Sequence, residues 1–167
     1  MKKIQLGGHR YKNKPIRGYA LVDDKDFDEL SKFRWHICAG YARRNAGKEI
    51  VVLMHRQLLN VPKGLVIDHI NGNKLDNRKE NLRVCTRAQN TRNSRLPTNN
   101  VSGYKGVSWH KHQRRWCAKI VINSVCKQLG YYKSKVEAAV AYNEAAVKYF
   151  GEFANLNKCV NANARKV

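Results

Sequence analysis

The sequence predicts an α+β fold in two modules, and three observations support this prediction. Short segments with the composition of strands alternate along the chain with segments that carry helix-capping residues. Turn-forming residues follow Leu96 and Pro97 without any bulky core residue, which indicates a linker at 97–101. Apolar residues make up 43% of the 167 residues and charged residues 27%, so the chain can bury a core and is not generally disordered.

The first 57 residues predict a small β-rich region. The predicted strands are 19–22, 35–41 and 50–54, and a short helix is predicted at 27–33. We expect Trp35, Tyr41 and Leu53 to lie in the core of this region, and we assign them no chemical role.

A strand, a polar loop, a second strand and a helix are predicted next. The strands are 65–67 and 82–85, and the loop between them is rich in asparagine. Thr86 and Gln89 have the spacing of a capping box, in which each side chain bonds to the backbone of the other residue. A helix is therefore expected from Arg87 to about Ser94.

Residues 102–157 predict a second module, a three-stranded antiparallel sheet packed on one helix. The strand candidates are 104–110, 116–122 and 126–132. Ser134 and Glu137 form another capping box, and Gly151 marks the end of the helix that follows. The expected organisation is thus a first domain at 1–96, the linker, this module, and a tail at 158–167.

The charge distribution predicts a nucleic-acid partner. Lys and Arg number 33 against 12 Asp and Glu, which gives a net charge of +21. Residues 81–136 contain no acidic residue, while basic residues there alternate with tryptophan and tyrosine. A membrane surface is disfavoured as the partner, because this stretch contains no basic amphipathic helix.

Apolar runs and cysteines predict a cytoplasmic protein with reduced thiols. The longest purely apolar run, Ile50 to Met54, is far shorter than the roughly 20 residues of a membrane helix, and no apolar segment follows Lys3 as in a signal peptide. The five cysteines are widely separated and form no C-x-x-C pair, which disfavours a structural zinc site or a disulfide framework.

Four polar residues are expected to converge on one small pocket. Asp68 and His69 end a predicted strand, Asn81 immediately precedes the next strand, and Asn90 lies in the first turns of the helix. Carboxylate and amide oxygens are the ligands that magnesium or manganese prefers, so Asp68 and Asn90 are candidate metal ligands. His69 would then be available to act as a base.

Residues 50–95, with the core segment VIDHINGNKLDNRKENLRVCTRAQNTRN, resemble the HNH nuclease motif, the ββα-metal fold of phage homing endonucleases and colicin nucleases. The resemblance implies that His69 deprotonates water for attack on a phosphate and that Asn81 braces the loop and orients His69. It also implies that Asp68 and Asn90 hold one divalent ion. Asn90 stands where the family name has a histidine, which favours magnesium or manganese over zinc.

Two alternatives remain open within this motif. Asn93 lies one turn beyond Asn90 and could replace it as the second ligand. His55, followed by Arg56, resembles a His-Arg pair that precedes the motif in phage members, and its role is either structural or phosphate-facing.

Residues 102–157 resemble the plant ethylene-response-factor (GCC-box-binding) domain, which also occurs fused to HNH nucleases in phage and bacterial genomes. In that family the sheet lies in the DNA major groove. The positions that match its DNA contacts are Lys105, His110, Arg114, Arg115, Trp116, Lys119 and Lys127. For Trp116 a position in the core is the alternative, and Arg87 and Arg92 of the motif helix are further candidate DNA contacts. Ser108 replaces a base-contacting arginine of the plant domains, so their target sequence is not carried over.

These features together predict a monomeric, magnesium- or manganese-dependent, site-directed DNA endonuclease of homing type. It would nick one strand of duplex DNA in a bacterial or phage-infected host cell. Two other functions are weighed against it: a non-catalytic, sequence-specific DNA-binding regulator with a decayed nuclease core, and an RNA-binding protein of ribosomal type.

Overall fold

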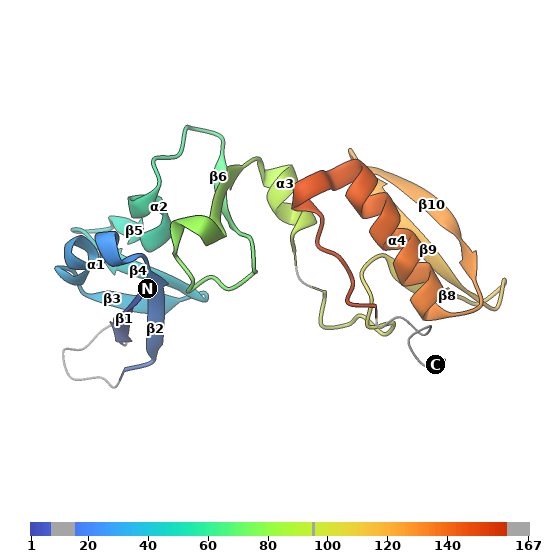
Figure 1. Ribbon diagram of the computed structural model, residues 1–167, viewed down its shortest axis with the longest axis horizontal. Helices are drawn as coiled ribbons and strands as arrows, with labels where there is room; N and C mark the ends of the chain where they lie inside the picture. The colour runs from blue at the N-terminus through green and yellow to red at the C-terminus, as the bar shows by residue number, and fades with distance from the viewer. Residues whose placement is uncertain (8–15, 95, 160–167) are drawn as a thin grey trace, which may run out of the picture. The chain divides into compact units, whose positions relative to one another are not determined.

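The computed structural model describes residues 1–7, 16–94 and 96–159, and it has the α+β fold that the sequence predicts. Three separate sheets and four α-helices lie within these residues (Figure 1). The chain divides into two compact units, Met1–Asn90 and Thr91–Val167. The division falls inside helix α3 (Arg87–Arg92), before the predicted linker. Residue 95 of the predicted motif and residues 160–167 of the predicted tail lie outside the described residues.

A five-stranded sheet forms the first part of unit 1. Its strands, in the order β2-β1-β3-β4-β5, are β1 (Lys2–Gly7), β2 (Gly18–Val22), β3 (Trp35–Cys38), β4 (Tyr41–Asn45) and β5 (Val51–Leu53). β1 pairs antiparallel with β2 and parallel with β3. The predicted single strand 35–41 is wrong: β3 and β4 form a hairpin, because Ala39 and Gly40 both adopt a positive φ and reverse the chain.

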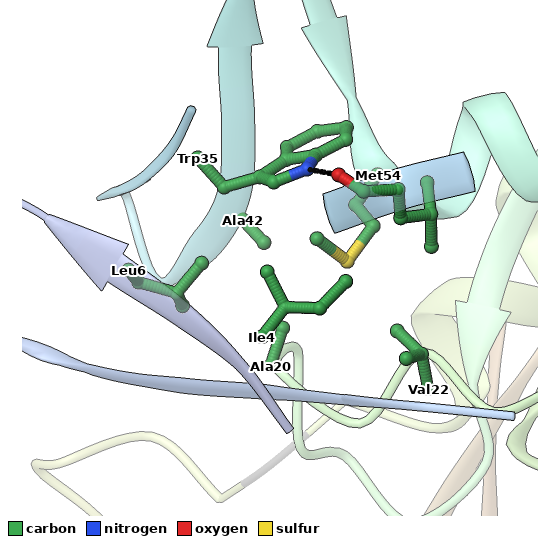
Figure 2. Packing of buried hydrophobic residues seen from close by; sticks show 8 residues of the cluster. Ile4, Leu6, Ala20, Val22, Trp35, Ala42 and Met54 are labelled. Atoms are coloured by element: carbon green, nitrogen blue, oxygen red, sulfur yellow. Dashed lines mark hydrogen bonds between the residues drawn. The ribbon is translucent and has the colours of Figure 1, made fainter. Parts of the chain in front are cut away.

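Two short helices, α1 (Asp24–Ser31) and α2 (Met54–Leu58), complete the core beside this sheet. Ile4 and Leu6 of β1 pack with Trp35 and Met54, as Figure 2 shows. The indole N–H of Trp35 donates to the carbonyl oxygen of Leu30 at 2.8 Å, so the polar atom of this core side chain is satisfied. The prediction that Trp35 lies in the core is confirmed.

The rest of unit 1 is a strand–loop–strand–helix arrangement. β6 (Val66–His69) and β7 (Leu82–Cys85) pair antiparallel, and a 3₁₀ turn (Lys79–Asn81) leads into β7. The predicted capping box of α3 is confirmed: the Thr86 N–H donates to Gln89 Oε1 at 2.8 Å, and the Gln89 N–H donates to Thr86 Oγ1 at 3.2 Å.

Unit 2 contains the predicted three-stranded antiparallel sheet and its helix. The elements are β8 (Val107–His110), β9 (Arg115–Ile122), β10 (Val125–Tyr132), α4 (Lys135–Phe150) and a final 3₁₀ turn (Gly151–Phe153). α4 lies across one face of the sheet (Figure 1), and its Ala138, Ala139 and Ala146 are fully buried. The small side chains allow close approach between the helix and the sheet. No helix in the described part of the chain is long and apolar enough to cross a membrane.

Candidate active site

Strand β6 ends with the two residues that were expected to carry the chemistry. Asp68 and His69 are 4% and 5% exposed. Asp68 lies opposite Arg83 of β7, and its Oδ2 accepts from Arg83 Nε at 2.9 Å and from Nη2 at 2.7 Å. This buried ion pair holds the carboxylate in one orientation at the end of the strand. Sequence reasoning missed Arg83, since finding it required the pairing register of the two strands.

The loop between β6 and β7 is closed by Asn81. Its Oδ1 accepts from the Asn71 N–H at 2.9 Å, and its Nδ2 donates to the Asp76 carbonyl at 2.7 Å. The backbone carbonyl of Asn81 accepts from the Ile70 N–H at 2.9 Å. The amide of Asn81 therefore connects the entrance of the loop, just after His69, to its exit.

The imidazole of His69 lies among aromatic rings from the first part of the unit. The ring of His55 stands edge-on to it at a centroid distance of 5.2 Å, and the ring of Tyr41 is 6.0 Å away. His55 is buried, which favours its structural role over a phosphate-facing one. Tyr41 was expected to be a core residue without a chemical role, yet the β3–β4 hairpin brings it beside His69.

Burial makes both histidines weak bases. It lowers the pKa of His55 from 6.5 to about 4, and the nearby His69 and Arg56 act in the same direction. Burial also lowers the pKa of His69, against the hydrogen bond to Asn77 Oδ1 and the charges of Asp68 and Asp76, which raise it. A neutral His69 near pH 7 is able to accept a proton.

Helix α3 meets the end of β6 at the thiol of Cys85. Burial raises the pKa of this thiol and the charge of Asp68 acts in the same direction, while the backbone N–H groups of Asp68 and Asn90, which face the sulfur, lower it. The backbones of the metal-ligand candidates Asp68 and Asn90 therefore both lie beside the same side chain. The alternative ligand, Asn93, belongs to the other unit, where its carbonyl accepts from Asn155 Nδ2 at 3.1 Å.

The donor set at this position fits a hard cation. Among the described residues, no group of three or more His, Cys, Asp or Glu side chains could hold a metal ion. Magnesium does not need such a group, because it is commonly bound by one or two carboxylates while phosphates and water complete its shell. A carboxylate has about four acceptor positions, and Arg83 uses two at Oδ2 of Asp68.

The sheet of unit 2 has one face turned away from α4. Ala118 and Ile120 of β9 pack toward the helix, so Arg115 and Lys119, which alternate with them, lie on the other face. His110 is paired with Arg115, and the ring of Tyr131 is 5.0 Å from that of His110. We call the face that carries His110, Arg115, Lys119 and Tyr131 the open face. Arg114 is exposed in the turn before β9.

Three of the residues predicted to contact DNA lie elsewhere. Lys105 Nζ donates to the carbonyls of Arg92, at the end of α3, at 2.5 Å and of Ser94 at 3.0 Å. Trp116 packs with the cluster under α4, the core position that the sequence left open. Lys127 pairs with the helix-facing Ile120, and its Nζ donates to the Tyr149 hydroxyl at 3.0 Å. The register of β10, which is not readable from the residues alone, decides this last placement.

Arg92 and Arg87 differ in their surroundings. The guanidinium of Arg92 lies over the ring of Phe150 at 4.7 Å from the ring centroid, within unit 2. Arg87 is exposed in the first turn of α3.

Known proteins resemble both parts of the chain. A family model described as HNH endonuclease matches residues 60–92. An uncharacterized HNH endonuclease of Acanthamoeba polyphaga mimivirus is 30% identical over 148 residues, which are 84% of this chain and 75% of that protein. Protein 3.8 of Escherichia phage T7 is 45% identical over 56 residues, 34% of this chain and 46% of that protein.

The C-terminal part of the chain resembles plant transcription factors. An AP2-like ethylene-responsive transcription factor of Arabidopsis thaliana is 45% identical over 53 residues, 30% of this chain and 15% of that protein. No solved structure matches the chain significantly. Because the mimivirus protein is 30% identical and is matched over 75% of its length, the chain belongs to the HNH endonuclease family.

Proposed function

We propose that this protein is a site-directed DNA endonuclease of homing type that uses one divalent metal ion and nicks one strand of duplex DNA. The observation that carries the proposal is the buried His69 directly beside Asp68, with the backbones of Asp68 and Asn90 both beside the Cys85 thiol. This arrangement supports a site in which a base, a carboxylate and an amide meet at one strand end. The acid-free basic stretch 81–136 supplies the attraction to a polyanion.

In this proposal His69 takes the proton from the water that attacks the scissile phosphate. Asp68 and Asn90 hold a magnesium or manganese ion, which when bound stabilises the negative charge on the phosphate and on the leaving 3′ oxygen. Arg83 fixes the orientation of the Asp68 carboxylate. Asn81 keeps the loop after His69 closed, and so keeps the imidazole in place.

Duplex DNA is held by the open face of unit 2. His110, Arg115 and Lys119, together with Arg114 in the turn, are the proposed DNA contacts of this face, and Arg87 and Arg92 of α3 contribute phosphate contacts. We assign Lys105, Trp116 and Lys127 structural roles instead. The protein acts as a monomer with one active site, in the cytoplasm of a bacterial or phage-infected cell.

A plasmid-nicking assay tests this proposal. Purified protein and supercoiled DNA are incubated with magnesium, with manganese, or with EDTA. Nicked circles are expected with either metal and none with EDTA, and the folded protein is expected to contain no stoichiometric zinc. Binding without nicking would favour the non-catalytic DNA-binding regulator. Displacement of duplex DNA by RNA in a competition assay would favour the RNA-binding protein of ribosomal type.

A further inference from the structure

We propose that Asn77 is a positioning residue that sets the tautomer of His69. Its Oδ1 accepts a hydrogen bond from the N–H at His69 Nε2, so that the lone pair of the neutral ring stays on Nδ1 and receives the proton of the attacking water. The inference rests on the proposed function of His69 as the base.

The contact between Asn77 and His69 is the basis for this tautomer. Asn77 Oδ1 lies 3.4 Å from His69 Nε2, and the Asn77 side chain is only 1% exposed. An amide oxygen only accepts, so a hydrogen bond across this contact requires the proton on Nε2. A neutral imidazole has one N–H and one lone pair, and Nδ1 then holds the lone pair. The distance is long for a hydrogen bond, and such catalytic contacts commonly shorten when substrate is bound.

The backbone around Asn77 is held by the N-terminal sheet. The Asn77 N–H donates to the carbonyl of Leu21 in β2 at 2.8 Å, and the Leu21 N–H donates to the carbonyl of Leu75, also at 2.8 Å. Leu21 and Asp76 form a parallel bridge between these bonds. The loop segment that carries Asn77 is therefore attached to β2 as a short additional strand, which gives the β-rich region a role in the active site.

The preceding residue, Asp76, is prevented from competing for His69. Its Oδ2 accepts from Arg78 Nη2 at 2.7 Å and from Asn71 Nδ2 at 2.8 Å. The carboxylate is thus committed to the loop, and the neutral amide of Asn77 is the group that lies at Nε2.

The amide nitrogen of Asn77 indicates that packing alone does not explain this residue. Asn77 Nδ2 is one of two buried side-chain nitrogen or oxygen atoms in the described residues that have no hydrogen-bond partner. A buried donor without a partner is unfavourable, and an apolar residue of the same size would avoid that cost. The contact of Oδ1 with His69 gives a reason for the amide in spite of this cost.

Nitrogen NMR of the full-length protein tests the inference. In ¹⁵N-labelled, metal-free protein above pH 7, the His69 resonances are assigned by comparison with His69→Gln. We expect Nε2 to resonate as a protonated nitrogen and Nδ1 as a nitrogen with a lone pair. In Asn77→Leu the two tautomers should mix, and kcat for nicking should fall by about 10²-fold, the cost of a misplaced catalytic group. KM should be unchanged.

Matched variants separate positioning from folding. Asn73→Ala removes an acceptor in the same loop, where Asn73 Oδ1 binds the Leu75 N–H at 3.1 Å, and it should leave the His69 tautomer unchanged. If Asn77→Leu does not fold, Asn77→Asp keeps an oxygen acceptor at the same place and should retain the Nε2–H tautomer.

Three results would overturn the inference: an Nδ1–H tautomer in the wild type, an unaltered tautomer in folded Asn77→Leu, or loss of the Nε2–H form in Asn77→Asp. A wild-type protein that shows the expected tautomer but does not nick DNA with metal would instead contradict the proposed function, and with it the catalytic purpose of the contact.

Discussion

His55 is buried against His69 and makes the stability of the protein depend on pH. Burial lowers the His55 pKa from 6.5 to about 4. Between these values the unfolded chain binds a proton that the folded protein does not, so stability decreases as the pH falls. We expect the free energy of unfolding to drop by roughly 3 kcal/mol from pH 7 toward pH 4, since one pKa unit corresponds to about 1.36 kcal/mol.

Urea unfolding at pH 7.5 and pH 5 measures this effect. His55→Gln should show a smaller difference between the two pH values than the wild type. His69, whose pKa is also lowered by burial, acts in the same direction and leaves a residual slope. An equal pH dependence of stability in the variant and the wild type would contradict the assignment of this effect to His55.

Asp68 has two separable roles, as a metal ligand and as the partner of Arg83. Asp68→Ala and Asn90→Ala should each abolish metal-dependent nicking, because each removes one of the two protein ligands. Asp68→Ala should also lower the free energy of unfolding by about 3 kcal/mol, since it takes the carboxylate from the mostly buried Arg83. Asn90→Ala is the control, with near-normal stability. Equal stability losses, or nicking that survives either change, would contradict this division.

At the scale of elements, the sequence predicts correctly those strands and helices whose ends are marked by neighbouring residues. β7 spans the predicted residues 82–85, and α3 begins at the predicted capping box. Pairing across the chain was not predictable in this way. β1 was missed because it is fixed by partners from β2 and β3, and Tyr41 reaches His69 only because a turn divides the predicted strand.

The same dependence on contacts between distant residues explains which residues of the site the sequence could predict. Asp68, His69, Asn81 and Asn90 were identified from their order and from a resemblance, whereas Arg83 and Asn77 were not. Both missed residues act through side-chain contacts across a strand pair or a loop, and no periodicity in the sequence marks such contacts.

Gly106 shows how tightly the sheet of unit 2 packs on α4. A Cβ at this position would lie 2.0 Å from Cδ2 of the buried Tyr142 and 2.6 Å from the Lys119 carbonyl oxygen. Gly103 has a similar positive φ but nothing within 4 Å of such an atom. Gly106→Ala should therefore destabilise the unit by about 3 kcal/mol more than Gly103→Ala. Thermal unfolding followed by circular dichroism measures this difference, and similar melting of the two variants would contradict the packing.

At the scale of the whole molecule, we expect the net charge of +21 to attract DNA mainly through a few exposed basic residues of unit 2. Each phosphate contact that is lost should reduce the slope of log K against log salt by about 0.9. The triple variant Arg114→Ala, Arg115→Ala, Lys119→Ala should therefore bind duplex DNA with a clearly shallower salt dependence. Fluorescence anisotropy in EDTA, over a series of salt concentrations, measures this slope.

Lys105→Met is the matched control for this experiment. It also removes positive charge, but the Lys105 ammonium is bonded to the carbonyls of Arg92 and Ser94. It should lower the stability of unit 2 and leave the salt slope unchanged. A slope reduced as much by Lys105→Met as by each exposed residue would argue against the open face as the DNA-binding surface.

The most direct test of the central claim compares wild type and His69→Ala in two quantities, the single-turnover nicking rate with magnesium and the affinity for duplex DNA. If His69 is the base, the rate should fall by about 10²–10⁴-fold while the affinity stays the same. A variant that nicks DNA at the wild-type rate, or that loses rate and affinity in equal measure, would contradict the account.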